Sequence, residues 1–426
     1  AQPPNPPTPL TQRRPRPSQP TAIVLRNGAR FYVDHAHPEY AAPETASARD
    51  AALWDKAGER VALAAVRALA ATPGGPDVGL YKNNTDGKGA SYGMHENYLV
   101  DRAVPFEDLV AFITPFLVTR QIFAGSGRVG LGQRGQEPGF QLSQRADFIE
   151  AEVGLETTLR RPIVNTRDEP HADPRRWRRL HVIVGDATMM EVATYLRVGA
   201  TSLVLAALEA GAWGGGFLAQ VRLAAPVPAF WEVSRDLGVN RPLALASGET
   251  ATAVSIQRRY LDLVARLGGG GVEMADLTGR WARLLDGLER DPLSAAREVE
   301  WVAKYRLLAA LAAREAAGWA SPKVAAADLQ WTDIRPERSL AGKVAAAGAT
   351  EALFTESEVA RAVSAPPRDT RAWERGRAVA EGGGRTLSAN WDSFTAVAAD
   401  DAVPHRHFLP DPADDAVPHG HSSPDL

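Results

Sequence analysis

The sequence predicts an α+β protein in which strands dominate the first part and helices the second. Short runs with alternating apolar and polar residues recur between residues 23 and 184, as in half-buried strands. From residue 189 to 316 apolar residues recur instead at three- and four-residue spacing, which indicates helices. Strands and helices do not alternate regularly, so an all-parallel α/β sheet is not expected.

The strand-rich part is predicted to begin with a hairpin. Ile23–Leu25 and Phe31–Asp34 flank an Asn27-Gly28 turn, and Pro38, which cannot donate a ladder hydrogen bond, is expected to end the second strand. The elements that follow are predicted in this order: a helix over Asp50–Ala71, a strand over Val78–Lys82, a strand through His95–Tyr98, a helix over Phe106–Phe123 bent at Pro115, a glycine-rich loop over Gly125–Gly139, extended chain over Phe140–Ile149, and strands over Arg161–Asn165 and Leu180–Val184.

The helical part begins with a long apolar segment, Met189–Ala210, which is expected to be buried. Three more helices are predicted over Thr252–Leu267, Met274–Leu288 and Ser294–Ala316. The predicted domains are a proline-rich linker or loop over residues 1–22, a large domain over 23–325, a small C-terminal domain over 326–396 and a disordered tail over 397–426. In that tail the hexapeptide Asp400–His405 recurs as Asp414–His419.

Composition narrows the class of protein. With 45% hydrophobic and 23% charged residues, the chain is typical of a soluble globular protein. A net charge of −3 favours neither nucleic acid nor an acidic membrane surface as a partner. The chain has no cysteine, which excludes disulfides and thiolate chemistry and makes the cytoplasm the simplest location. No apolar run of about 18 residues was found that would predict a membrane span.

The densest group of chemically useful side chains lies between Arg30 and Tyr40. In a strand, Arg30, Tyr32 and Asp34 share one face, and Glu39 follows shortly after. Histidines stand beside carboxylates here and in later strands, at His35, His37, His95 and His171, and His181 follows another strand start. Converging imidazoles and carboxylates predict a metal or metal–nucleotide site, while a solvated strand end remains the alternative.

Arginines gather between Arg160 and Arg179, with Trp177 among them. This run is compatible with bidentate binding of phosphate, with nucleic acid stacking on Trp177, or with a solvated face, because acidic residues interleave with it. The overall charge favours a small anion. Gly125–Gly130 fits a loose Gly-x-Gly-x-x-Gly pattern, but no helix with a following ribose-binding acid accompanies it, so dinucleotide binding is a weak hypothesis.

Several motifs together resemble one known family, the Pup ligases and Pup deamidases/depupylases, which are relatives of glutamine synthetase. The motifs that carry the resemblance are Asn27–Arg30, Val33–Tyr40, Lys82–Asp86, Ser91–Gly93, His95–Tyr98, Asn165–Asp173, Arg179–Asp186, Asp328–Gln330, Pro366–Arg371 and Trp391–Ser393. The spacing from Asp34 to Glu39 is one residue shorter than in the ligase, and Gly154–Leu159 also resembles the hydrolase branch.

The resemblance implies a glutamine-synthetase-like catalytic domain with an antiparallel sheet, packed helices and a small C-terminal domain. It implies ATP- and Mg²⁺-dependent hydrolysis of the C-terminal Gln carboxamide of Pup and of the isopeptide bond in pupylated proteins, with an indirect link to the bacterial proteasome. Asp34 would be the catalytic carboxylate. Arg30, Arg145, Arg167 and Trp391 would contact the nucleotide or the developing oxyanion, and Tyr32, Glu39, His95 and His181 would hold Mg²⁺.

One departure from the family pattern leaves alternatives open. Members of the family begin with a strand that carries a Glu-x-Glu pair of metal ligands, and no such pair precedes residue 23. The sequence is therefore expected to be a fragment or a degenerate member. The alternatives are a Pup–protein ligase and, in another class, a catalytically impaired Pup-binding protein.

Overall fold

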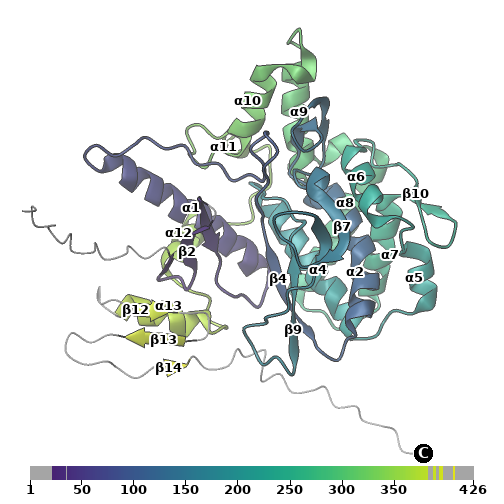
Figure 1. The fold of residues 1–426 in the computed structure, drawn as a ribbon, viewed down its shortest axis with the longest axis horizontal. Helices are drawn as coiled ribbons and strands as arrows, with labels where there is room; N and C mark the ends of the chain where they lie inside the picture. The colour runs from purple at the N-terminus through teal and green to yellow at the C-terminus, as the bar shows by residue number, and fades with distance from the viewer. Residues whose placement is uncertain (1–21, 35, 382–386, 390–392, 397–405, 408–426) are drawn as a thin grey trace, which may run out of the picture.

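A computed structural model describes residues 22–34, 36–381, 387–389, 393–396 and 406–407 (Figure 1). Nearly all of the proline-rich segment and most of the repeat tail lie outside these residues. The architecture is α+β, as predicted. Helices α2, α4 and α6–α8 gather on one side of strands β4 and β9, and α1, α12 and α13 lie on the other side with the N-terminal strands (Figure 1).

The central sheet has four strands in the order β4-β9-β8-β7. Their bounds are Glu96–Asp101 for β4, Ile149–Gly154 for β7, Arg161–Asn165 for β8 and Trp177–Val182 for β9. The expectation of an antiparallel sheet is only partly correct, because β7 pairs with β8 in parallel. Asn165 donates side-chain hydrogen bonds to the carbonyls of Leu155 and Glu156, which secures the short return segment beside the end of β8.

A separate N-terminal sheet contains β1 (Ala22–Val24), β2 (Arg30–Asp34) and β3 (His37–Ala41), all antiparallel. The predicted Asn27-Gly28 turn is present, with Gly28 at φ 78°, in the left-handed region that favours glycine. The second strand ends before Pro38 as expected, but Pro38 itself lies within β3. Because β3 is an edge strand of this sheet, the missing N–H of Pro38 removes no required ladder bond.

Helices form the bulk of the remaining structure. Their bounds are Ala48–Ala71 (α1), Phe106–Thr119 (α2), Gln121–Ala124 (α3), Glu191–Glu209 (α4), Gly215–Val221 (α5), Pro226–Arg235 (α6), Ala253–Ala265 (α7), Val272–Arg290 (α8), Glu300–Ala312 (α9), Pro322–Trp331 (α10), Leu340–Ala346 (α11), Glu356–Ser364 (α12) and Ala372–Glu381 (α13), with 3₁₀ turns over Ala146–Phe148 (η1), Pro292–Arg297 (η2) and Gly318–Ala320 (η3). The long predicted helices are confirmed to within a few residues at their ends, apart from the last, where Ser294–Ala316 divides into η2 and α9. The predicted Phe106–Phe123 helix divides at Arg120 into α2 and α3.

Helix α4 is the centre of the helical layer. It is long and apolar enough to cross a membrane by length and composition, with a mean hydropathy of 1.3, contrary to the estimate from the sequence. However, 72% of that stretch is buried inside the protein. Because α4 packs against α1, α7 and α8, its apolar surface is used as core.

Two further sequence predictions were wrong. Val78–Lys82 is extended but forms no named strand, since its pairing is limited to a bridge between Tyr81 and Asp333 and to neighbouring backbone bonds. The predicted loop Gly125–Gly139 is largely a hairpin of β5 (Arg128–Leu131) and β6 (Glu137–Gln141). Gly127, Gly130, Gly132 and Gly135 have φ between 59° and 87°, in the left-handed region, so the bends of the hairpin explain much of the glycine density.

The remaining short strands and the last helices complete the chain. The strands are β10 (Leu243–Ala244), β11 (Thr250–Ala251), β12 (Leu387–Ala389), β13 (Ser393–Ala396) and β14 (Arg406–His407). Helix α12 packs on α1. Helix α13 reaches the N-terminal turn, where Arg375 Nε donates to the Gly28 carbonyl at 2.8 Å. Helix α13 therefore contacts the turn between β1 and β2.

Candidate active site

The β2–β3 hairpin carries four of the predicted site residues, namely Arg30, Tyr32, Asp34 and Glu39. In its register Tyr32 pairs with Glu39, and Asp34 pairs with His37 at the exposed end of β2. The Tyr32 hydroxyl donates to Glu39 Oε2 at 2.6 Å, and the Arg30 guanidinium lies 5.6 Å from the centre of the Tyr32 ring. Burial and the Glu39 carboxylate raise the pKa of Tyr32. The shared face predicted from strand alternation is therefore confirmed.

Two histidines meet across the central sheet, at the β4–β9 pair. The ring centres of His95 and His181 are 4.9 Å apart, and His181 Nδ1 lies 2.8 Å from Asn97 Oδ1. Burial and then the charges of Arg145, Arg167 and Arg179 lower the pKa of His95 to about 4, while Asp34 acts in the opposite direction.

Burial followed by repulsion from His95 lowers the pKa of His181 to about 3. The lowered pKa values favour the neutral form of both imidazoles, which can accept a hydrogen bond or bind a metal ion.

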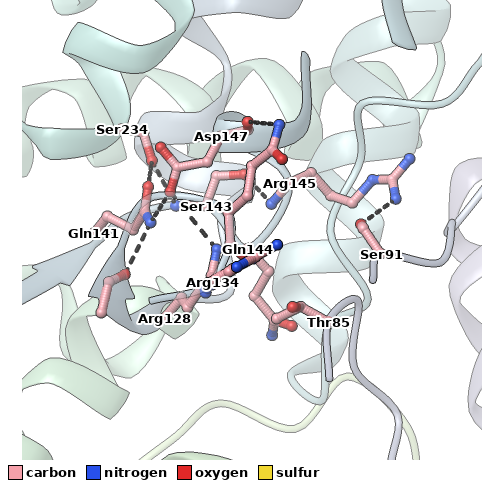
Figure 2. Close-up of polar contacts among 12 residues, drawn as sticks. Thr85, Ser91, Arg128, Arg134, Gln141, Ser143, Gln144, Arg145, Asp147 and Ser234 are labelled. Atoms are coloured by element: carbon pink, nitrogen blue, oxygen red, sulfur yellow. Dashed lines mark hydrogen bonds and ion pairs between the residues drawn. The ribbon is translucent and has the colours of Figure 1, made fainter. Parts of the chain in front are cut away.

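Arg145 is a buried side chain whose charge acts on His95, and Figure 2 shows its hydrogen bond to Ser91. It is 1% exposed, and its guanidinium donates to Ser91 Oγ at 2.7 Å, to the Tyr92 carbonyl at 3.0 Å and to the Ile183 carbonyl at 3.0 Å. Burial, reinforced by the charge of Arg161, lowers the pKa of Arg145 to about 9. These bonds join the segment before β4 to the residue after β9.

Beneath Arg145 lies a buried polar network that the sequence did not reveal. The Asp186 carboxylate accepts from the backbone N–H groups of Ser126, Gln144 and Arg145 at 2.9, 3.0 and 3.2 Å and from the Ser143 hydroxyl at 2.9 Å. Figure 2 shows Ser143 and Gln144 beside Arg145. Their only signal in the sequence was polar residues next to strand ends.

Asn84 links this network to the segment that precedes β4. Its backbone N–H donates to Gln144 Oε1 at 2.9 Å, its side-chain amide donates to the Tyr92 carbonyl at 3.0 Å, and its Oδ1 accepts from the Ala187 N–H at 2.7 Å. Asn84 is fully buried, yet its backbone N–H, its side-chain amide and its Oδ1 each have a hydrogen-bond partner. Two of these partners, Gln144 and Ala187, are distant in sequence.

The arginine-rich segment is less cationic than its sequence suggests. Arg102 holds Asp168 bidentately at 2.8 and 3.0 Å, Arg175 pairs with Asp173 at 2.9 Å, and Arg179 pairs with Glu169 at 2.9 Å. Arg167 lines a cavity of about 260 Å³ between the ends of β8 and β9 and the start of α2. Arg175 and Arg179 are thus paired with acids of the same segment, while the side chains of Arg178 and Arg179 are only 13% and 17% exposed.

The predicted metal ligands do not come together as one site within the described part of the chain. Trp391 and His35 lie outside the described residues. The structure gathers Tyr32 with Glu39 and His95 with His181, but within the described part of the chain no three His, Asp or Glu side chains stand close enough to hold a metal ion. A carboxylate such as Glu39 suits Mg²⁺, whereas paired imidazoles suit softer metals, so the described residues fit Mg²⁺ only in part.

Solved structures first define the class of protein. The complex of the prokaryotic ubiquitin-like protein Pup with its ligase PafA matches with a TM-score of 0.81 and 34% identity, covering 92% of this chain and 80% of that one. The Pup ligase PafA in complex with ADP matches with a TM-score of 0.80 and 35% identity, covering 92% and 87%. The fold is therefore that of a Pup ligase, of the glutamine-synthetase-like class.

Sequence comparison defines the family. The model of the Pup-ligase protein family matches residues 7–395, and the chain belongs to this family. It is 51% identical to the Pup deamidase/depupylase of Mycobacterium tuberculosis and 52% identical to that of Mycolicibacterium smegmatis, in each case over 89% of this chain and 76% of the relative. It is 50% identical to the depupylase of Acidothermus cellulolyticus, over 87% of this chain and 74% of the relative. Identity is thus higher to these hydrolases than to the two ligase structures.

Proposed function

We propose that this chain is a Pup deamidase and depupylase, an amidohydrolase that acts on carboxamide and isopeptide bonds. The observation that carries the proposal is its 50–52% identity to Pup deamidases and depupylases over 87–89% of its length. Asp34 is exposed at the end of β2 and its charge acts on the His95 imidazole, which is compatible with that chemistry. Its partners would be Pup and pupylated proteins, with an indirect connection to the proteasome, and its location the cytoplasm.

The proposed reaction uses Asp34 as the catalytic carboxylate. It either attacks the side-chain amide carbon of the C-terminal Gln or removes a proton from the water that attacks. In the first route the C–N bond breaks, ammonia or a lysine amine leaves with a proton, and water then cleaves the Asp34 anhydride. Arg30 and Arg167 would stabilise the developing oxyanion. Arg145 would hold Tyr92 in place.

We also propose how the protein binds its nucleotide and its metal ion. ATP would bind as a cofactor through Arg30, Arg167 and Trp391, which is supported by the ADP complex of the related ligase. Arg145, which the sequence suggested as a further contact, is buried and donates to Ser91, Tyr92 and Ile183 instead. Mg²⁺ would be held by Tyr32, Glu39, His95 and His181 and would organise the phosphates. Isothermal titration of Mg²⁺·ATP into the protein and into Glu39→Gln tests this assignment. We also propose that residues 23–325 form the catalytic domain and residues 326–396 a small C-terminal domain.

The function is tested by mass spectrometry of Gln-ended Pup incubated with this chain, Mg²⁺ and ATP. We expect the terminal Gln to become Glu, with a mass gain of about 1 Da, and Asp34→Asn to abolish the conversion, because it removes the only proposed nucleophile or base. Conversion that survives in Asp34→Asn would contradict the catalytic role of Asp34. Absence of conversion with retained Pup binding would favour the impaired Pup-binding protein.

Ligation is the second candidate, because the two solved neighbours are ligases. It differs in what happens to ATP. A ligase releases ADP in proportion to the conjugate formed, whereas the proposed hydrolase removes Pup without stoichiometric ADP. Measuring ADP and conjugates in the same reaction therefore separates the two.

A further inference from the structure

We propose that Tyr92 is a positioning residue for Asp34 and that it acts through His37. The proposal rests on the function proposed above in naming Asp34 as the catalytic group. It concerns how the edge hairpin that carries Asp34 is kept in register with the central sheet, which carries His95 and His181.

Asp34 stands at an end of a sheet that needs support from outside. It occupies the last pair of the β2–β3 ladder, opposite His37, and its neighbour Val33 is 58% exposed. The β1-β2-β3 sheet and the β4-β9-β8-β7 sheet are separate in hydrogen bonding. Among the described residues, no ladder hydrogen bond therefore fixes the distance between Asp34 and the histidines.

The far end of the hairpin is fixed firmly. The Tyr40 hydroxyl accepts a hydrogen bond from Asn27 Nδ2 at 3.0 Å. Its ring lies directly on α1, since a Cβ atom at Gly58 would lie 2.7 Å from Tyr40 Cε1. The hairpin can thus pivot about Tyr40 unless its tip is also held.

The tip is held by a ring contact. The His37 and Tyr92 rings have centres 4.5 Å apart and planes inclined by 36°. This is the usual separation of an attractive aromatic pair. His37 is directly opposite Asp34 in the ladder. Its ring contact with Tyr92 therefore holds the end of the β2–β3 pair at which Asp34 lies.

Tyr92 is itself anchored to the central sheet. Its carbonyl accepts from Arg145 Nη1 and Asn84 Nδ2, each at 3.0 Å, and its N–H donates to the Asn84 carbonyl at 3.1 Å. Arg145 and Asn84 continue to Ile183 and Ala187, just beyond β9. A continuous series of contacts therefore leads from the end of β9 through Tyr92 and His37 to Asp34.

The test compares Tyr92→Ala, Tyr92→Phe, His37→Ala and the double variant Tyr92→Ala/His37→Ala. Lys88→Ala is the matched control, since Lys88 is exposed in the same segment and no side-chain contact is found for it among the described residues. Two quantities are measured: kcat and KM for deamidation of Gln-ended Pup, and amide hydrogen exchange of the β2–β3 hairpin.

We expect Tyr92→Ala to lower kcat about 10-fold with KM within about 2-fold, because a misplaced reacting group affects the chemical step more than binding. Tyr92→Phe retains the ring and should keep both constants. The double variant should be no worse than either single variant, as expected for residues that act through one contact. Hairpin exchange should rise about 3-fold or more in Tyr92→Ala and His37→Ala, and not in Tyr92→Phe or Lys88→Ala.

Three results would overturn the proposal: unchanged hairpin exchange in Tyr92→Ala, additive losses in the double variant, or a Tyr92→Phe variant as impaired as Tyr92→Ala. The exchange measurement needs no turnover, so it decides the proposal even if the native chain fails to convert Pup. Such a failure would count against the proposed function alone.

Discussion

Arg145 lies in an environment unlike the one expected of an arginine near a nucleotide site. An arginine close to a candidate nucleotide site is expected to face phosphate. Here its three hydrogen-bond acceptors are uncharged groups of Ser91, Tyr92 and Ile183, and the side chain is almost fully buried. Its planar donor fork spans acceptors from two segments, which a lysine ammonium cannot do.

Arg145→Lys should therefore damage the protein although it keeps the charge. We expect the free energy of unfolding to fall by about 2 kcal/mol, because at least one buried carbonyl loses its donor. Deamidase activity should fall about 10-fold or more, because Tyr92 shifts when its carbonyl loses the hydrogen bond from Arg145. Urea denaturation and Pup deamidation measure the two effects. Arg134→Lys is the control, since Arg134 is exposed nearby, and its change should stay within about 0.5 kcal/mol. Equal stability of the two variants would contradict the structural role of Arg145.

At the same scale, the limits of sequence reasoning are physical. Arg30, Tyr32 and Asp34 were predictable as neighbours because alternate side chains of one strand share a face, whereas the pairing of Tyr32 with Glu39 depends on β3, which the sequence did not predict. His95 and His181 are far apart in the chain, and only the β4–β9 pairing brings their rings to 4.9 Å. The sequence did not indicate which groups Asn84 and Gln144 bind, because the hydrogen-bond partners of a buried amide come from distant parts of the chain.

At the scale of elements, the long helices and the β1–β2 hairpin with its Asn27-Gly28 turn were predictable, because periodicity and turn chemistry are local. The β5–β6 hairpin was missed, since its glycines at bends are indistinguishable from loop glycines in sequence. The parallel β7–β8 pair was missed for another reason: strand direction within a sheet depends on tertiary contacts such as the bonds of Asn165 to Leu155 and Glu156.

Helix α1 positions the hairpin through Gly58, and this contact can be tested. Alanine in a helix interior is usually more stable than glycine by about 1 kcal/mol. At Gly58 the new methyl group would collide with the ring of Tyr40, whose hydroxyl accepts a hydrogen bond from Asn27. We expect Gly58→Ala to destabilise the protein by about 1–3 kcal/mol and to lower deamidase activity, because the hairpin that carries Asp34 must move.

Gly279→Ala in α8 is the matched control. There the new Cβ would meet only the flexible end of Arg283, at 3.4 Å, so the substitution should stabilise the protein by about 0.5–1 kcal/mol and leave activity unchanged. Thermal unfolding and Pup deamidation distinguish the two variants. Stabilisation by Gly58→Ala would show that the hairpin does not rest on α1.

At the scale of the molecule, the described N-terminal strands are joined to the last helix through Glu44. Arg371 Nε donates to Glu44 Oε1 at 2.8 Å, and Arg375 holds both carboxylate oxygens while its Nε donates to the Gly28 carbonyl at 2.8 Å. Arg375 is 1% exposed in its side chain and Glu44 23%. Since α13 closes over the turn before β2, loss of this ion pair loosens the sheet that carries Asp34.

This junction predicts a pH dependence of stability. Burial disfavours ionisation of Glu44, but the bonds and charges of Arg375 and Arg371 outweigh burial and hold its pKa below the usual 4.5. A carboxyl with a depressed folded-state pKa stabilises the fold above its unfolded pKa, and that contribution is lost as the pH falls through the folded value. We expect Glu44→Gln to lower the free energy of unfolding by about 2 kcal/mol at pH 7. The difference from the native chain should shrink steadily below about pH 4.5.

Urea denaturation at pH 7, 5 and 3.5 measures this difference. Glu381→Gln is the control, because Glu381 pairs with Arg377 on the same helix but is 65% exposed, and its change should remain below about 0.5 kcal/mol at every pH. A Glu44→Gln penalty that stays constant between pH 7 and 3.5 would mean that the shape of the side chain, and not its charge, joins the N-terminal strands to α13. A penalty that shrinks in parallel with a rising rate of hairpin exchange would tie the ionisation of Glu44 to the placement of Asp34.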